Sequence, residues 1–372
     1  MKKYVWLIFF FFVLVSCRNH SVPGEILQKN DVIEYASWFD YEEFSDYTKI
    51  VVKSPWDSTA YLQTYILVPK NQPLPDSLPS GTLIRTPLER TVCFPSVTCG
   101  FLRELGVDST IVGVAESQYI HIESIQEKIK NGQILDVGQA FNPDSEKLIL
   151  IQPEAIFANT LQDAGIGQIT KTGIPVIECV EYMEFIPLGQ SEWLKFIALF
   201  FDKKDEADRL FSETKDRYNE LKALVGDIKN RPTVFTETMY GNVWYLPGGK
   251  SYMAHLLSDA GANYIWKDNE NSGSIALSFE QVLLEAEKAD YWLIKYYDAK
   301  EMSYADLSSQ NANYSLFQAY KNRRIQTLNT LKTAYYEELP IHPDIMLSDM
   351  ISIFHPELLP DYTPVYFQKM SK

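Results

Sequence analysis

The sequence contains few cysteines and no paired metal-ligand motif. Four cysteines occur among 372 residues, and none stands in a C-x-x-C pair or at zinc-finger spacing from a histidine, so a structural zinc site is not expected. Cys17 lies in the N-terminal region described below. We expect the other three, Cys93, Cys99 and Cys179, to be buried free thiols, with a Cys93–Cys99 bridge as the less favoured alternative.

Positive charge is also scarce. The chain holds 34 lysines and arginines against 49 aspartates and glutamates, which gives a formal net charge of −15. No cluster of lysines and arginines stands out along the sequence. Because an acidic chain repels the phosphate backbone, we do not expect a nucleic-acid partner.

Enzymatic sequence motifs are missing as well. The chain has no G-x-S-x-G, Walker loop or H-E-x-x-H, and no G-x-G-x-x-G between a strand and a helix. We therefore expect a protein that is not an enzyme and that holds no cofactor and no metal. Capture of a bare metal ion and an enzyme of unrecognised type are lower-ranked alternatives. No i,i+4 pair occurs among the four histidines after the N-terminal region: His121, His255, His342 and His355.

The N-terminus carries a short apolar stretch that is too short for a good membrane-spanning helix. It covers residues 4–15 after a cationic start, whereas a spanning helix needs roughly 20 apolar residues. This pattern predicts a signal peptide over residues 1–16. Because Leu14-Val15-Ser16-Cys17 is similar to the lipobox of bacterial lipoproteins, we expect Cys17 to be the lipidated first residue, followed by a tether to residue 31. An ordinary signal peptide with an incidental Cys17 is the alternative.

The rest of the chain is rich enough in apolar residues to build large cores. Hydrophobic residues make up 46% and aromatic residues 13% of the sequence, which excludes wholesale disorder. Residues 48–54 and 60–68 are β-rich and are separated by a turn signal, so we expect an N-terminal β hairpin. Residues 69–81 are rich in proline and are expected to form a loop.

From Arg90 onward, short apolar strands alternate with helical patterns. This alternation predicts right-handed βαβ units and mostly parallel sheets. The first set of strands is "RTVCF", "STIVGVA", "QILDVG", "AIFAN" and "IPVIEC", and the second is "TVFTET", "DYWLIKY" and "RIQTLN". Expected helices include residues 163–172, 278–286 with a capping box at Ser278 and Gln281, 314–320 and 344–354.

A helical region separates the two sets of strands. Residues 205–225 would form a helix of about 30 Å at 1.5 Å per residue, long enough to run from one domain into the next. The fold class that follows is α/β, with two doubly wound βα lobes joined by a single long helix and an extra N-terminal β hairpin. We place the N-terminal lobe at residues 32–187, the helical connector at 188–229 and the C-terminal lobe at 230–372.

Four segments, in order, resemble the substrate-binding proteins of ABC importers for ferric siderophores, haem and vitamin B12. They are "RTVCFPSVTCGFLRELGVDSTIVGVAE", "ILDVGQAFNPDSEKLILIQPEAIFAN", "WYLPGGKSYMAHLLSDAGANYIW" and "LSFEQVLLEAEKADYWLI". The resemblance covers roughly residues 90–356 and is greatest to lipoproteins of Bacteroidetes-type bacteria. It implies a cell-envelope protein, lipid-anchored to a membrane and facing the periplasm, that delivers a metal-chelate or cobalamin-type ligand to an ABC permease dimer.

The resemblance fails at the permease-docking glutamates. The family usually carries one on each lobe, but the first-lobe position is Thr98-Cys99-Gly100 here, and the second falls near Ser258-Asp259. Asp259 is therefore the weak candidate for docking.

Ligands of open α/β sheets lie outside the carboxyl ends of the strands, here between the lobes. We expect Trp244 and Tyr245 at the rim because a Pro-Gly-Gly turn follows them. The segment "YYEELP", residues 335–340, is expected to be a loop at the mouth of this cleft. The candidate ligand-binding residues at the strand ends are Phe94, Ser96, Glu116, Tyr119, Tyr182, Tyr240, Trp244, Tyr245, Lys295, Tyr296 and Asn329.

These strand ends are aromatic and contain no arginine and only one lysine. Aromatic walls favour a large planar or chelated organic ligand, and the lack of cations disfavours a strongly anionic one. The resemblance favours an iron complex, siderophore or haem, by a narrow margin, with cobalamin as the alternative.

Overall fold

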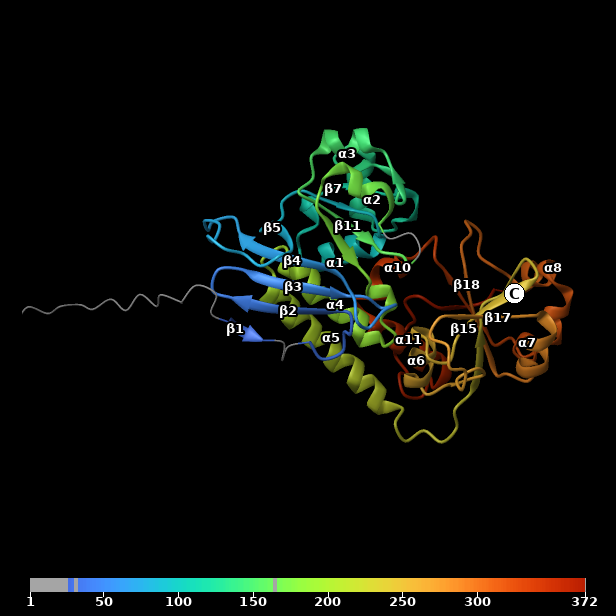
Figure 1. Ribbon diagram of the computed structural model, residues 1–372. Helices are drawn as coiled ribbons and strands as arrows, with labels where there is room; N and C mark the ends of the chain where they lie inside the picture. Colours follow the sequence, from blue (N-terminus) through green and yellow to red (C-terminus); the bar gives the residue numbers. More distant parts are fainter. Residues whose placement is uncertain (1–25, 30–32, 163–165, 372) are drawn as a thin grey trace, which may run out of the picture.

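The computed structural model describes residues 26–29, 33–162 and 166–371, and these form two α/β lobes with an added N-terminal sheet (Figure 1). The signal peptide and Cys17 lie outside the described residues. Within the tether expected over residues 17–31, Ile26–Lys29 forms strand β1, which pairs with β2 (Phe39–Phe44), so the expectation is wrong for these four residues.

The N-terminal sheet is larger than the hairpin that the sequence predicts. Its order is β1-β2-β3-β4-β5, and β3 (Thr48–Lys53) and β4 (Tyr61–Pro69) form the expected antiparallel pair. Strand β5 (Thr82–Thr86) adds in parallel to β4. Side chains from one face of this sheet pack on helix α4 (Pro187–Leu199), for example the Phe39 ring at 5.1 Å from Trp193. The sheet is thus part of the first-lobe core.

The first lobe has a five-stranded parallel sheet in the order β12-β11-β6-β7-β8. The chain starts in the middle and adds strands on both sides, which is the doubly wound arrangement expected. The strands are β6 (Thr91–Cys93), β7 (Ile111–Val114), β8 (Leu135–Asp136), β11 (Ala155–Asn159) and β12 (Val176–Cys179). The helices are α1 (Ser96–Glu104), α2 (Glu123–Lys130) and α3 (Ser145–Ile151). A helix expected over residues 163–172 is instead a 3-10 helix, Gly167–Thr172, among the described residues.

The two helices in the connector region are placed differently. Helix α4 packs mostly in the first-lobe core, and only Leu188 near its start lies in the second-lobe core. Helix α5 (Lys204–Leu224) runs from one lobe towards the other (Figure 1). Its residue Ala207 lies in the first-lobe core and Tyr218 in the second-lobe core.

The second lobe repeats the design with a sheet in the order β16-β13-β18-β19-β20. Its parallel strands are β13 (Thr233–Thr236), β16 (Asn263–Tyr264), β18 (Tyr291–Tyr296) and β19 (Ile325–Asn329), and β20 (Gln368–Lys369) is an antiparallel edge. A small antiparallel sheet, not predicted from the sequence, contains β14 (Met239–Tyr240), β15 (Val243–Pro247) and β17 (Ser274–Leu277).

The helices of the second lobe mostly follow the sequence patterns. The Ser278–Gln281 capping box is present at the start of α7. Residues 314–320, expected as one helix, are split between a 3-10 turn, Ala312–Leu316, and the short α9. The helices are α6 (Tyr252–Asp259), α7 (Phe279–Ala286), α8 (Tyr304–Gln310), α9 (Gln318–Lys321), α10 (Tyr335–Glu338) and α11 (Pro343–Phe354).

The three described cysteines are buried and free, as expected. None of the described helices is long and apolar enough to cross a membrane.

Candidate ligand cleft between the two lobes

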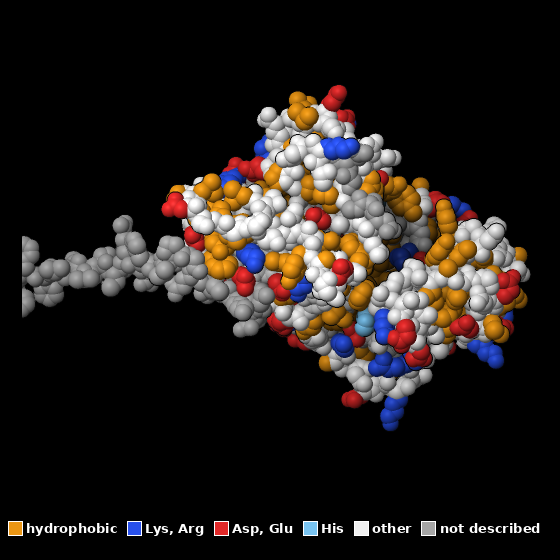
Figure 2. All heavy atoms as spheres, viewed as in Figure 1, with side chains coloured by type: hydrophobic (Ala, Val, Ile, Leu, Met, Phe, Trp, Pro, Cys, Tyr) orange, Lys and Arg blue, Asp and Glu red, His pale blue; other side chains and the backbone are white. Residues whose placement is uncertain are grey.

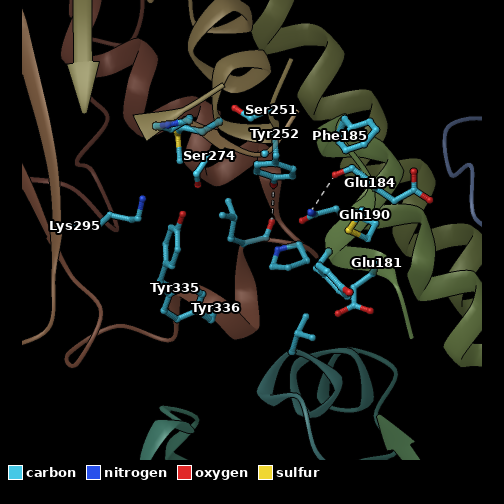
Figure 3. Close-up of a pocket in the computed structure, with 18 of the residues that line it drawn as sticks. Glu181, Glu184, Phe185, Gln190, Ser251, Tyr252, Ser274, Lys295, Tyr335 and Tyr336 are labelled. Carbon is cyan, nitrogen blue, oxygen red and sulfur yellow. Dashed lines mark hydrogen bonds between the residues drawn. The ribbon is translucent and has the colours of Figure 1, made fainter. Parts of the chain in front are cut away.

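A cavity of about 940 Å³ lies between the lobes and is lined by residues of both. Figure 2 shows the molecular surface hollowed at this place, and Figure 3 shows ten of the lining side chains with labels. The volume is within the range of small-molecule sites. About half of the lining residues lie at or just after the carboxyl ends of β6, β11, β12, β13 and β18, where the sequence places the ligand.

Five of the residues that the sequence singles out line the cavity. The small β14-β15-β17 sheet carries Tyr245, which is 49% exposed, and the neighbouring Tyr240. The five are Ser96, Tyr182, Tyr240, Tyr245 and Lys295.

Two other candidates are core residues, so their expected place at the cleft is wrong. Trp244 is fully buried, and its indole Nε1–H donates to the backbone oxygen of Thr236 at 3.1 Å. Side chains alternate along a strand, so on β15 Tyr245 faces outward and Trp244 faces the core. Phe94 is buried among apolar side chains of the first lobe.

Four further candidates lie outside the cavity lining. Asn329 is buried, and its amide donates to the oxygen of Asp298 at 2.7 Å, so it holds a loop. The Tyr296 hydroxyl donates to Glu301 at 2.6 Å. Tyr119 meets Tyr297 of the other lobe, with ring centroids 6.2 Å apart. Glu116, the fourth candidate, is also absent from the residues that line the cavity.

Several lining residues were not identified from the sequence. The expected mouth segment, residues 335–340, does contribute, since Tyr335, Tyr336, Leu339 and Pro340 line the cavity. It is not the loop that we expected, because Tyr335–Glu338 forms helix α10. Glu181, Glu184 and Phe185 follow β12 by a few residues, so their closeness to a strand end is the signal that could have identified them. The missed polar and aromatic residues are Asn159, Glu181, Glu184, Phe185, Gln190, Glu237, Thr238, Ser251, Tyr252, Ser272 and Ser274.

Glu184 is held by the fold rather than left free for a ligand. Its Oε1 accepts N–H groups from Ser37 at 2.8 Å, Trp38 at 3.2 Å and the Trp193 indole at 3.0 Å. Burial raises the pKa of the Glu184 carboxyl, although these donors act in the opposite direction. The carboxyl therefore fastens the segment that enters the N-terminal sheet.

Glu181 differs from the other carboxyls of the cleft in its partners. It is 3% exposed, and burial raises its pKa to about 7, with the nearby Glu184 charge adding to the rise. Its own backbone N–H and the Asn159 side chain donate to it, and both lower the pKa in part. No lysine or arginine forms an ion pair with Glu181 in the part of the chain that the structure describes.

The second lobe brings its charges together as a pair. The Lys295 ammonium at the end of β18 contacts Glu237 Oε1 at the end of β13. Burial lowers the pKa of Lys295, but the Glu237 carboxylate outweighs this and holds the pKa above its ordinary value. Lys295 and Tyr335 point into the same part of the cleft (Figure 3).

Helix α10 fastens the second lobe to the first. The Glu337 carboxyl accepts the backbone N–H of His121 at 2.7 Å, and Glu338 pairs with Arg103 at 2.9 Å. Gly100 of α1 lies so close that a Cβ there would overlap the carbonyl of Glu337. We call residues 335–340 the α10 clamp, because this segment lines the cleft and also crosses to the first lobe.

The positions that correspond to the docking glutamates also have intramolecular roles. Thr98 and Cys99 are buried on α1. The Asp259 side chain is 16% exposed and pairs with Lys222 at 2.8 Å, and it also accepts the Tyr218 hydroxyl at 2.8 Å. Asp259 therefore joins α6 to α5, and its contact with a permease stays a prediction.

The described residues contain no group of three or more histidine, cysteine, aspartate or glutamate side chains placed to hold a metal ion. No histidine is among the described side chains that line the cleft. The arrangement can enclose a bulky ligand between aromatic side chains and offer it carboxyl oxygens.

The chain is similar to curated and solved proteins over most of its length. It is 28% identical over 323 residues to an uncharacterized lipoprotein of Methanocaldococcus jannaschii, covering 82% of this chain and 76% of that one. A periplasmic heme-binding protein from Pseudomonas aeruginosa has a TM-score of 0.59 at 16% identity, covering 77% of this chain and 99% of that one. The molybdate-binding protein MolA of Haemophilus influenzae has a TM-score of 0.58 at 18% identity, covering 75% and 89%. These structural similarities show the fold.

The family model described as "Periplasmic binding protein" matches residues 92–330, a segment that includes strands of both lobes and the helix between them. This match covers more than half of the chain, and the chain therefore belongs to the periplasmic binding protein family.

Proposed function

We propose that this protein is the substrate-binding lipoprotein of an ABC importer, and that it captures an iron complex, siderophore or haem, and delivers it to the permease dimer. The single observation that carries this proposal is the cavity of about 940 Å³ between the lobes, lined by side chains of both. A cavity of this size accepts a drug-sized or larger ligand. Family membership supports binding and delivery rather than catalysis.

The aromatic lining supports a chelated or planar organic ligand over a bare ion. Tyrosines line the cleft from both lobes, and stacking on such rings supplies affinity without charge. The tyrosines are Tyr182, Tyr240, Tyr245, Tyr252, Tyr335 and Tyr336.

Cobalamin is the second candidate. Lys295 is the only lysine or arginine among the described lining residues, and Glu237 neutralises it. A cleft without a free cation favours neutral ligands over strongly anionic chelates, and this supports cobalamin as much as a neutral siderophore complex.

Titration of tryptophan fluorescence against ferric siderophores, haem and cyanocobalamin tests this function, with calorimetry as the check because these ligands absorb light. We expect saturable binding of at least one iron complex at one site per chain. Tight binding of cyanocobalamin without a response to any iron complex would reverse our order. Turnover of a ligand would contradict the binding-protein function.

We also propose that the mature chain is anchored at Cys17 in the cell envelope and faces the periplasm. The N-terminal pattern supports this, and two of the similar archaeal proteins are named lipoproteins. Fractionation of cells that express the wild type and Cys17→Ser tests it. We expect the wild type with membranes and the variant released, whereas a fully soluble wild type would contradict anchoring.

A further inference from the structure

Three carboxyls line the cleft in the described part of the chain, and their partners differ. Glu237 is paired with Lys295, and Glu184 accepts three N–H groups of the fold. Glu181 receives its own backbone N–H and the Asn159 side-chain amide, but no cation. Two of the three carboxyls therefore hold other segments of the fold, and Glu181 is the one whose remaining lone pairs can meet a ligand.

Two donors on the same wall are already used. The Tyr182 hydroxyl donates to the backbone oxygen of Thr160 at 2.7 Å. The Gln190 amide donates to the backbone oxygen of Glu184 at 3.3 Å (Figure 3). The Oδ1 atom of Asn159 is buried and has no hydrogen-bond partner among the described residues. The first-lobe wall therefore has acceptors in excess, and a buried acceptor without a donor costs free energy.

We propose, on the basis of the function proposed above, that Glu181 contacts a cationic or hydrogen-bond-donating part of the ligand, and that the cleft consequently binds cationic and neutral chelates in preference to anionic ones. A ligand donor or positive charge supplies what this wall lacks. The net charge of −15 on the whole chain acts in the same direction, since it attracts cations and repels anions. Tyr240, Tyr245 and Tyr336 on the opposite side then contact the apolar part of the ligand.

Proton linkage accompanies this contact. A cationic ligand binds the ionised carboxylate better, and the ionised fraction of a group with a pKa of about 7 rises about tenfold between about pH 6 and about pH 8. The affinity should therefore rise with pH over this range. The other titratable groups near Glu181 or facing it across the cleft are Cys179, Tyr182, Glu184, Glu237, Tyr252, Lys295, Tyr335 and Tyr336.

Three ferric chelates of different charge test the proposal on the wild-type protein. Ferrioxamine B carries a free ammonium group, ferrichrome is neutral and ferric enterobactin is strongly anionic. We expect dissociation constants to increase in this order, and that of ferrioxamine B to fall as the pH rises from about 6 to about 8. The readout is calorimetry in buffers of different ionisation enthalpy, which also counts the protons released.

The variant Glu181→Gln separates charge from shape, with Glu178→Gln as the matched control. Glu178 is similarly buried on β12 but does not line the cleft, and its carboxyl accepts the Thr160 hydroxyl at 2.6 Å. We expect Glu181→Gln to weaken ferrioxamine B binding by at least about tenfold and to flatten its pH dependence. Glu178→Gln should do neither.

The outcomes are distinguishable. If the anionic chelate binds as tightly as the cationic one, or if folded Glu181→Gln binds ferrioxamine B as the wild type does, the role of Glu181 is refuted while the binding function stands. If none of the three chelates, haem or cyanocobalamin binds, the proposed function fails and this inference fails with it.

Discussion

The two walls of the cleft use their carboxyls in opposite ways. On the second-lobe wall, Glu237 is neutralised by Lys295, so the pair adds no net charge. On the first-lobe wall, Glu181 has no cationic partner among the described residues, and burial raises its pKa to about 7. The charge of the first wall therefore depends on the pH and on the ligand that enters the cleft, whereas the charge of the second wall stays constant.

Separating the two walls of the cleft should give the largest loss in the free energy of unfolding. Gly100 of α1 touches the backbone of the α10 clamp, so Gly100→Leu would force the clamp off the first lobe. Overpacking against a backbone typically costs about 1–3 kcal/mol and at times more. Because the ion pair between Arg103 and Glu338 would separate as well, we expect a loss of about 3 kcal/mol in the free energy of unfolding, measured by urea denaturation.

Gly226→Ala is the matched control for this loss. Its added Cβ would meet only the carbonyl of Ala223, at an ordinary 3.4 Å. We expect a change within about 0.5 kcal/mol, as for a typical surface substitution. Equal stability of Gly100→Leu and Gly226→Ala would show that the α10 clamp does not hold the lobes together.

Removing the cation of the second wall makes it resemble the first. In Lys295→Met, Glu237 loses its partner while partly buried, as its side chain is 21% exposed. Breaking a fully buried pair costs about 3–5 kcal/mol, and partial exposure lowers this, so we expect about 2 kcal/mol. Thermal and urea unfolding measure the loss, and adding Glu237→Gln should restore part of it.

Lys250→Met provides the surface comparison for this pair. Lys250 pairs with Glu270 where both side chains are well exposed, at 59% and 80%. Surface pairs contribute about 0–1 kcal/mol, so little change is expected. If Lys250→Met were as destabilised as Lys295→Met, the cleft pair would have no special role.

The walls also differ in how far the sequence predicts them. Lys295 lies near the end of the apolar strand "DYWLIKY", where a buried charge is costly unless a carboxylate or a ligand meets it. Its partner Glu237 lies on a different strand, and nothing in the local sequence selects it. Strand β11 and the capping box of α7 were found because they depend on neighbouring residues.

The residues that the sequence analysis misplaced or overlooked have physical reasons of the same kind. Trp244 was placed at the rim because its strand, β15, was not recognised, and alternation along a strand then decides which side faces the core. Glu181 was missed because the chain forms a 3-10 turn, Glu181–Met183, directly after β12. The contact of Gly100 with Glu337 joins residues far apart in the sequence, so no local pattern reports it.

A smaller effect comes from removing the charge of the first wall. Burial in the folded state raises the pKa of Glu181 from 4.5 to about 7. The folded protein therefore binds the carboxyl proton of Glu181 more tightly than the unfolded chain does. That stabilisation is fully present below about pH 4.5 and is lost as the pH rises to about 7. Glu181→Gln has no such loss, so above about pH 7 we expect it to be more stable than the wild type by about 1–2 kcal/mol. Unfolding at a series of pH values measures this, and parallel curves for both proteins would contradict it.

The smallest expected effect is on the distance between the walls. Bending the lobes apart would break i→i−4 hydrogen bonds of α5, which reaches from Ala207 in one core to Tyr218 in the other. The cores also interlock, since Leu188 of α4 lies in the second-lobe core and Ile341, directly after the α10 clamp, lies in the first-lobe core. We therefore expect small-angle scattering curves of the ligand-free and ligand-bound protein to superimpose. Gly100→Leu, which loosens the clamp but leaves α5 intact, should show the larger difference between its two curves. A large closure in the wild type would mean that the walls move independently, and the contrast between a fixed wall and a responsive one would then have to be replaced by a hinge.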